Sequence, residues 1–297
     1  MHVDRAQSYP LYIAVGQRVQ GGVHGSLTLY GADMLHINER EYEFKAGLTL
    51  RDWASHLRSV ADVFIVNGFP VPEDTIVNDG DNCWLISRGA FPSYEEMEHL
   101  LYARHTPGVQ EKVKGQTIGI MGLGGLGSVV ALSLARIGVG TLLLADYDVV
   151  EPSNLNRQQY FIDQVGMKKT DAMLENLKRV NPYLKVDIFD GELTEANIPK
   201  IFTGVDVLVE CFDGAAMKAA ALRTVLTMTG MAYVGASGMA GYGDNNLIKT
   251  TRIKKNIYLV GDGEAGAKSG QGLMAPRVGI AAHHQANQVL RILLGLG

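Results

Sequence analysis

Three glycines at the junction between a predicted strand and a predicted helix are the first residues in this sequence that suggest chemistry. Gly122, Gly124 and Gly127 follow the apolar run at 117–121 and precede the apolar-rich segment at 128–137. Glycines at this spacing let a phosphate approach the backbone more closely than a Cβ would permit, and the helix offers unpaired N–H groups. The pattern predicts a nucleotide-binding loop, and by itself it leaves NAD, FAD, S-adenosylmethionine and ATP open.

A carboxylate follows this loop at the separation that a nucleotide site requires. Asp146 lies at the end of the next predicted strand, 19 positions beyond Gly127. An acid at that place can accept hydrogen bonds from ribose hydroxyls. The combination favours a nucleotide site over a tight turn with a purely structural role.

The residues after this acid favour ATP over NAD. The stretch SNLNRQ holds Asn154 and Arg157, which are three positions apart and are expected to face the same way on a loop or helical turn. Lys169 begins the next predicted helix, and Asp213 follows a later predicted strand. We expect these side chains to converge, because the carboxyl ends of parallel strands line one crevice. Cleavage of ATP between its α and β phosphates needs cations on the departing pyrophosphate and an acid for Mg²⁺, which is the equipment of an adenylyltransferase.

Strands and helices alternate from residue 115 to residue 297. Strands are predicted near 117–121, 141–145, 185–189, 205–210 and 232–236, with a later hairpin at 247–251 and 256–260. Helices are predicted near 128–137, 167–180, 194–202, 214–229 and 278–294. The alternation predicts an α/β fold, with a Rossmann-like, mostly parallel sheet covered by helices on both faces.

Residues 34–89 form a separate predicted unit of the β-grasp, or ubiquitin-like, type. Its predicted strands lie at 35–37, 42–44, 63–66, 75–77 and 83–86, with a helix capped by Thr49 and Asp52 and a hairpin turn at Asn67-Gly68. This order and the pattern VNG…P…V.DGD resemble the small sulfur-carrier protein ThiS. A working carrier ends in a free Gly-Gly carboxylate, whereas the chain here continues through Ser87-Arg-Gly-Ala. This copy therefore has no carboxylate to activate.

Two further segments complete the expected organisation. Residues 1–33 show no clear periodicity, and we expect an extension that is either poorly ordered or packed on the rest. Residues 90–114 are predicted to be a linker helix, because Ser93 can cap a helix whose first turn is acidic.

Composition excludes several classes of protein. The chain has 297 residues, 46% of them hydrophobic and 20% charged, and a formal net charge of −4. It has no long Lys/Arg run of the kind that binds nucleic acid, no apolar run of membrane length and no signal-peptide pattern, so a cytoplasmic protein is expected. Cys83 and Cys211 lie in apolar surroundings and are interpreted as buried thiols.

Four stretches, GLGGLGS, ADYDVVEPSNLNRQ, VGMKKTDA and ECFDG, resemble the ThiF/MoeB family, the bacterial relatives of ubiquitin-activating enzymes. The closing stretch MAPRVGIAAHHQANQVLR resembles the family's last helix. The resemblance implies that ATP and Mg²⁺ are bound, that Asp146 contacts the ribose and that Asp213 holds Mg²⁺. The residues that it assigns to the triphosphate are Asn154, Arg157 and Lys169.

The resemblance also implies a homodimer with a carrier bound at each active site. Arg104, in LYARHTPGV, would match an arginine that reaches the ATP of the other subunit; an exposed helix arginine is the alternative. The chain departs from many family members because it has no CxxC pairs, which argues against a zinc site. The loop after the strand at 232–236 reads ASGMAGYG without a cysteine, so adenylation is expected without a covalent sulfur or thioester step.

The sequence therefore favours ATP-dependent adenylation of the C-terminal glycine carboxylate of a separate ThiS-like carrier in thiamine biosynthesis, with release of pyrophosphate. A MoeB-like enzyme acting on the molybdopterin carrier would share the same catalytic residues. A threonylcarbamoyladenosine dehydratase would share the ATP site but not the β-grasp unit. A non-catalytic carrier-binding scaffold is the alternative from another class.

Overall fold

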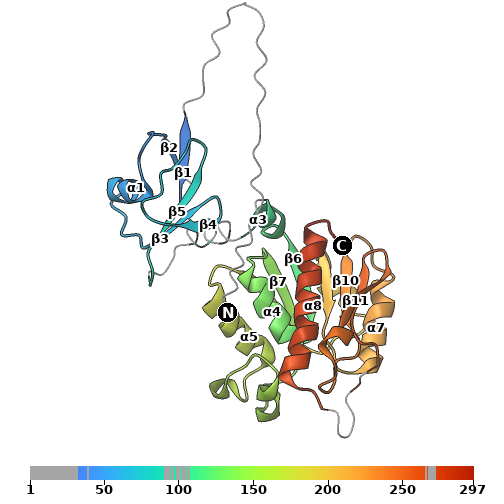
Figure 1. The fold of residues 1–297 in the computed structure, drawn as a ribbon. Coiled ribbons are helices and arrows are strands. Elements are labelled where there is room, and N and C mark those ends of the chain that lie inside the picture. The colour runs from blue at the N-terminus through green and yellow to red at the C-terminus, as the bar shows by residue number, and fades with distance from the viewer. Residues whose placement is uncertain are drawn as a thin grey trace, which may run out of the picture.

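The computed structural model of the protein describes residues 33–38, 40–89, 94, 97, 101, 105, 108–264, 266 and 272–297. Within this part the chain forms a five-stranded sheet and a seven-stranded sheet that share no strand (Figure 1). The first is a small β-grasp-like sheet and the second is mostly parallel and Rossmann-like, which confirms the predicted fold class. None of the helices in this part combines the length and apolarity that crossing a membrane requires.

The smaller sheet has the strand order β2-β1-β5-β3-β4 within the described residues up to 89. Its strands are β1 (Met34–Ile37), β2 (Arg40–Glu43), β3 (Val63–Val66), β4 (Phe69–Val71) and β5 (Asn82–Ile86). Helix α1 (Leu50–His56) begins at the predicted capping box of Thr49 and Asp52. Trp53 of α1 shares a buried core with Leu35 and Leu85, so the helix covers one face of this sheet.

The short strand of this unit lies elsewhere than predicted. Asn67 and Gly68 both have positive φ, 51° and 86°, as a two-residue hairpin turn requires. The turn places Phe69 opposite Val66, so residues 69–71 pair with β3 directly after it. The strand predicted at 75–77 is wrong: in the described structure this segment makes an isolated bridge between Ile76 and Thr49.

The larger sheet has the strand order β11-β12-β10-β9-β6-β7-β8. Its strands are β6 (Thr117–Met121), β7 (Thr141–Asp146), β8 (Lys185–Asp190), β9 (Val207–Glu210), β10 (Ala232–Ala236), β11 (Lys249–Lys254) and β12 (Ile257–Gly261). All neighbouring pairs are parallel except β11 with β12, which form the predicted hairpin. The chain leaves β6 toward β7 on one side and returns to β9 on the other, and this change of direction opens a crevice at the carboxyl ends of the strands.

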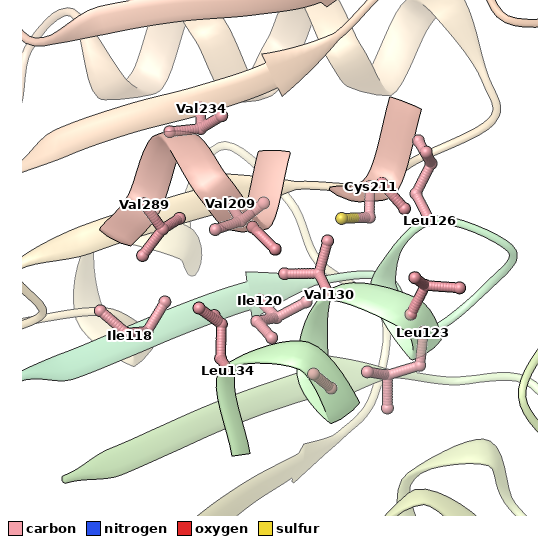
Figure 2. Close-up of a cluster of buried hydrophobic side chains, with 14 of the residues drawn as sticks. Ile118, Ile120, Leu123, Leu126, Val130, Leu134, Val209, Cys211, Val234 and Val289 are labelled. Atoms are coloured by element: carbon pink, nitrogen blue, oxygen red, sulfur yellow. The ribbon is translucent and has the colours of Figure 1, made fainter. Parts of the chain in front are cut away.

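Helices cover both faces of the larger sheet, as predicted. They are α3 (Val109–Val113), α4 (Gly127–Arg136), α5 (Lys169–Val180), α6 (Ile198–Ile201), α7 (Ala215–Val225) and α8 (Ala275–Leu293). On one face, Ile120 of β6 and Val209 of β9 gather with Leu134 of α4 and Val289 of α8 (Figure 2). On the other face, α6 and α7 share a second buried core with β6 and β9. Phe202 belongs to this core.

The predicted linker helix is described in part. Helix α3 lies inside the range predicted for it, and Tyr94 packs edge-on against Tyr183, with 5.4 Å between ring centroids. Most of the range 90–107 lies outside the described residues, as do residues 1–32 of the predicted extension at 1–33.

Candidate nucleotide-binding site

The glycine loop is closed by direct backbone packing. A Cβ on Gly127 would lie 1.9 Å from the carbonyl oxygen of Gly122, and Gly122 itself has a φ of +89°. A Cβ on Gly122 would lie 3.1 Å from the carbonyl oxygen of Cys211. A Cβ on Gly124 would have only the amide of Gln158 nearby, at 3.8 Å. Gly122 and Gly127 therefore fix the start of α4 against β6 and β9, while Gly124 leaves its side of the loop open.

A cavity of about 590 Å³ lies beside this loop, at the carboxyl ends of the strands. Among the residues predicted for the site, those that line the cavity are Gly122, Gly124, Asp146, Arg157, Lys169 and Asp213. The described lining residues do not include Gly127 or Asn154. The structure thus brings together residues from five separate segments of the sequence.

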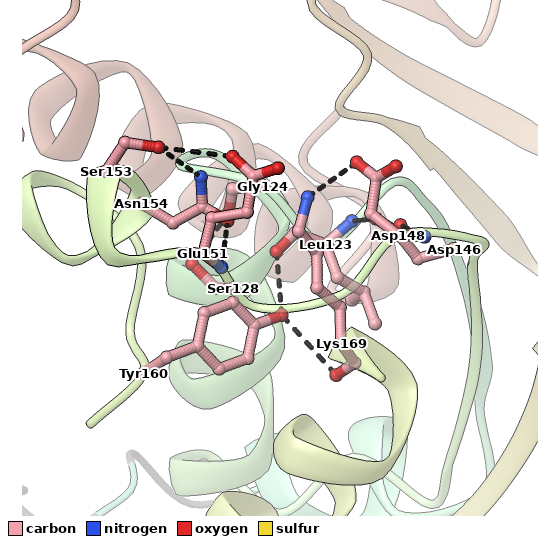
Figure 3. Close-up of polar contacts among 10 residues, drawn as sticks. All are labelled: Leu123, Gly124, Ser128, Asp146, Asp148, Glu151, Ser153, Asn154, Tyr160 and Lys169. Carbon is pink, nitrogen blue, oxygen red and sulfur yellow. Dashed lines mark hydrogen bonds and ion pairs between the residues drawn. The ribbon is translucent and has the colours of Figure 1, made fainter. Parts of the chain in front are cut away.

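The carboxylate of Asp146 is held by the backbone on both of its oxygens. Oδ2 accepts from the Leu123 amide at 2.6 Å, and Oδ1 accepts from the Asp148 amide at 2.8 Å (Figure 3). A carboxylate has about four acceptor positions, so two remain for a ligand. Asp146 is mostly buried yet lines the cavity, a placement that suits hydrogen bonds from ribose hydroxyls.

Asp148 and Tyr160 connect the start of α5 to the glycine loop. Lys169 is buried, and its Nζ lies 2.8 Å from Oδ2 of Asp148. The hydroxyl of Tyr160 donates to the carbonyl of Leu123 at 2.8 Å and lies 3.4 Å from that of Lys169 (Figure 3). The ammonium is therefore fixed at the cavity wall with a carboxylate partner, which a buried charge needs. The sequence leaves Asp148 open as either support for the site or a solvated acid, and its contact with Lys169 favours the first.

Asn154 and Arg157 have different surroundings. Residues 152–156 form a 3₁₀ helix, in which Oδ1 of the buried Asn154 accepts from the Glu151 amide at 3.2 Å. Arg157 is the C-cap residue of this helix, with a φ of −153°, and it lines the cavity. Its guanidinium donates to Oδ1 of Asn156 at 2.8 Å. Arg157 thus lines the cavity and Asn154 is not among its described lining residues, while their common direction stays a prediction.

Asp213 lies in the exposed loop after β9 and lines the cavity. Its side chain has no hydrogen bond or ion pair with another described residue, so the carboxylate is available to a cation. No three His, Cys, Asp or Glu side chains in the described part cluster as a protein-built metal site would require. The arrangement fits Mg²⁺, which typically takes one or two carboxylates and completes its coordination with phosphate oxygens and water.

Two residues beside the loop that carries Asp213 were not predicted from the sequence: a buried acid, Glu210, and a third cation, Lys218. Glu210 is 1% exposed, and its Oε1 accepts from the Phe212 amide at 2.7 Å and from Nζ of Lys218 at 2.9 Å. Lys218, on α7, also lines the cavity. An acid at the end of an apolar strand with a lysine eight positions later was the available signal. The pair fixes the loop that carries Asp213 between β9 and α7.

Acidic groups also line the cavity. The pKa of the exposed Tyr147 is raised by nearby negative charge, first that of Asp148, with burial and then Glu192, Asp146 and Asp213 adding to it. Acids of this group line the same cavity as the cations Arg157, Lys169 and Lys218. The site therefore offers positive groups for phosphates and negative groups for a ribose and a divalent cation, as Mg·ATP requires.

Cys211 lines the cavity but is not prepared for nucleophilic chemistry. Its side chain is buried, and burial raises the pKa of the thiol far above its ordinary value. Burial likewise raises the pKa of Cys83 in the smaller sheet to about 12. Because the thiolate is the reactive form, both residues behave as packing groups. Arg104, predicted as a residue shared between subunits, lies outside the described residues.

Comparison with known families matches both units of the chain. A model of the ThiF family matches residues 98–297, and a model of ThiS-like ubiquitin matches residues 34–89. Ubiquitin-like modifier-activating enzyme 5 of Oryza sativa is 39% identical over 116 residues, which cover 35% of this chain and 28% of that protein.

Adenylyltransferase and sulfurtransferase UBA4 of Eremothecium gossypii is 31% identical over 193 residues, which cover 63% of this chain and 43% of that protein. The chain thus spans less than half the length of these relatives. Among solved structures, tRNA N6-threonylcarbamoyladenosine dehydratase of E. coli in complex with ATP matches with a TM-score of 0.59. The match has 22% identity and covers 68% of this chain and 95% of the other, and it shows a shared fold.

The Gly127→Ala variant tests the closed glycine loop. The added Cβ must displace the Gly122 carbonyl, so we expect the free energy of unfolding to fall by about 1–3 kcal/mol and ATP binding to weaken. Urea denaturation and calorimetric titration with ATP measure the two effects. The control is Gly279→Ala on α8, where a Cβ meets nothing within 4 Å and alanine should stabilise the helix by about 0.5–1 kcal/mol. A Gly127→Ala protein as stable as the wild type would contradict the packing described.

Proposed function

Because the chain belongs to the ThiF family and carries a ThiS-like ubiquitin unit before its nucleotide site, we propose that it is an ATP-dependent adenylyltransferase. Its proposed substrate is the C-terminal glycine carboxylate of a separate ThiS-like sulfur carrier protein in thiamine biosynthesis. The observation that carries the proposal is the convergence of Arg157, Lys169 and Asp213 on the cavity that also contains Asp146. A hydride-transferring enzyme seldom has use for cations such as Arg157 and Lys169 so close to the ribose acid.

In the proposed reaction the carrier carboxylate attacks the α-phosphorus of ATP in line. A carboxylate–phosphorus bond forms, the bond between the α-phosphorus and the bridging oxygen breaks, and the electron pair leaves with pyrophosphate. No general base is needed, because a C-terminal carboxylate is already ionised at neutral pH. Mg²⁺, held by Asp213, would neutralise phosphate charge and orient the leaving group.

Arg157 and Lys169 would stabilise the charge that develops on the pyrophosphate. Lys169 is suited to this because its ammonium is buried and fixed before ATP arrives, so little side-chain freedom remains to be lost on binding. The triphosphate would compete with Asp148 for this ammonium. Asp146 would orient the nucleoside through its two remaining acceptor positions.

The fused β-grasp unit is proposed to serve assembly or regulation and not to be the substrate. The amide of Arg88 donates to Oδ1 of Asp62 at 3.0 Å, and the hydroxyl of Ser87 donates to the carbonyl of Val60. The end of this unit is thus bound to its own surface, where a free carrier would present an extended tail. A homodimer, with Arg104 of each subunit reaching the ATP of the other, is part of the same proposal.

Two alternatives are weighed against this proposal. A molybdopterin carrier would meet the same residues, so the carrier's identity rests on the association with the ThiS-like unit. A non-catalytic scaffold would have no need of an unpaired Asp213 or of a fixed Lys169.

UBA4, a relative of the chain, is named both an adenylyltransferase and a sulfurtransferase. The absence of a cysteine from the segment 236–243 favours the first activity alone here.

ATP–pyrophosphate exchange tests the proposal. Purified protein should exchange pyrophosphate into ATP when a ThiS-like carrier ending in Gly-Gly is added, and not when the carrier lacks its last glycine. Asp213→Ala should lower the Mg²⁺-dependent rate by about 10²-fold or more, while circular dichroism shows an intact fold. Exchange with the molybdopterin carrier alone would select the first alternative, exchange with neither would select the scaffold, and an unaffected Asp213→Ala rate would remove this residue from the mechanism.

Cys211→Ala tests whether adenylation proceeds without a covalent step on this chain. The thiol is buried and its pKa is raised, so we expect the variant to retain the carrier-dependent exchange rate within about twofold. Cys83→Ala, in the other unit, is the matched control. A folded Cys211→Ala protein that has lost exchange would show that the sulfur takes part in the reaction.

A further inference from the structure

One buried arginine joins three segments of the chain beside the cavity. Arg277, in the first turn of α8, is 4% exposed. Its Nη1 donates to the carbonyls of Gly243 and Asp244 at 2.6 and 2.9 Å, and its Nη2 lies 2.7 Å from Oδ2 of Asp262. The guanidinium therefore connects the start of α8, the segment after β10 and the residue that follows β12.

Asp262 transmits this attachment to the two loops beside it. Its amide donates to the Gly238 carbonyl at 2.9 Å, and its Oδ1 accepts from the Glu264 amide at 2.8 Å. The amide of Gly263 donates to the Ser237 carbonyl at 3.0 Å. A Cβ on Gly238 would lie 2.0 Å from Oδ1 of Asp262, so the loops are in contact without room for a side chain.

These loops form a wall of the cavity that lies apart from the nucleotide groups. Residues 237–240 follow β10, and Gly263 and Glu264 follow β12, and all of them line the cavity. Asp146 is at the end of β7, which β6 and β9 separate from β10 in the sheet (Figure 1). A nucleoside held by Asp146 and a triphosphate held by Lys169 would leave this wall to the second substrate.

We propose that Arg277, through Asp262, is a positioning residue that fixes this wall for the glycine tail of the carrier. The inference rests on the proposed function and adds to it which residues set affinity for the second substrate. Met239 packs in the main core, but Ser237, Gly238, Ala240 and Gly263 are small and provide little side-chain packing to fix the position of the wall. The ion pair of Arg277 and Asp262, whose side chains are 5% and 10% exposed, holds the wall in place instead.

The test separates the two substrates kinetically. In carrier-dependent ATP–pyrophosphate exchange with a ThiS-like protein ending in Gly-Gly, Arg277→Gln and Asp262→Asn should each raise the KM for the carrier by about tenfold or more, with the KM for ATP within about twofold of wild type. Arg291→Gln is the matched control, because Arg291 lies in the last turn of α8 and donates to the Leu296 carbonyl, far along the chain from the cavity loops.

Arg277→Lys keeps the positive charge but lacks the planar guanidinium that reaches three acceptors at once. This variant replaces Arg277→Gln in the test if the glutamine variant fails to fold. Its carrier KM should rise as well, with circular dichroism unchanged. Equal increases in both KM values, or an unchanged carrier KM in a folded variant, would overturn the positioning role alone. A wild-type protein without exchange would instead overturn the proposed function and the inference that rests on it.

Discussion

The contact between Gly122 and Gly127 is the constraint on which the rest of the site depends. Because no Cβ fits between these backbones, α4 begins immediately after β6 and its first turn points into the crevice between β6 and β9. The carbonyl of Cys211, directly after β9, lies against Gly122. The loop that carries Asp213 is thereby held close to the amide of Leu123, which binds Asp146.

Charge pairing completes what the backbone contact begins. Buried Lys169 has a carboxylate partner at the cavity wall, buried Arg277 has Asp262 next to the loops that line the cavity, and buried Glu210 has the ammonium of Lys218. Each pair joins the residues at the end of a strand to the α-helix that comes next in the chain. Because removing one partner would leave a buried charge uncompensated, the pairs hold the loops in register with the sheet. The polar side chains are therefore fixed before any ligand binds, which favours catalysis by electrostatic stabilisation.

Much of this arrangement could be predicted from the sequence, because a parallel sheet brings the ends of its strands to one edge. Asp146, Lys169 and Asp213 each follow a strand or begin a helix, so topology alone brings them together. Asn154 could not be placed in this way, since its direction depends on a cap within a short 3₁₀ helix.

Other features depend on contacts between distant segments. The partners of Arg277 lie 15 to 34 positions away in the sequence, and no local sequence pattern predicts them. The short strand of the β-grasp unit was misplaced for a related reason. The turn at Asn67 and Gly68 aligns residues 69–71 with β3, whereas their Pro70 and exposed Phe69 do not resemble a strand. Periodicity identifies strands by their buried faces, and this edge strand has little buried surface.

The intact mass of the carrier measures the central claim most directly. A ThiS-like protein ending in Gly-Gly would be incubated with the wild-type protein, ATP, Mg²⁺ and inorganic pyrophosphatase, and then analysed by mass spectrometry. The account predicts that the carrier gains the mass of one AMP group, and that a carrier without its last glycine gains nothing. An unchanged carrier mass while ATP is converted to ADP would contradict adenylation and with it the assignment of the site.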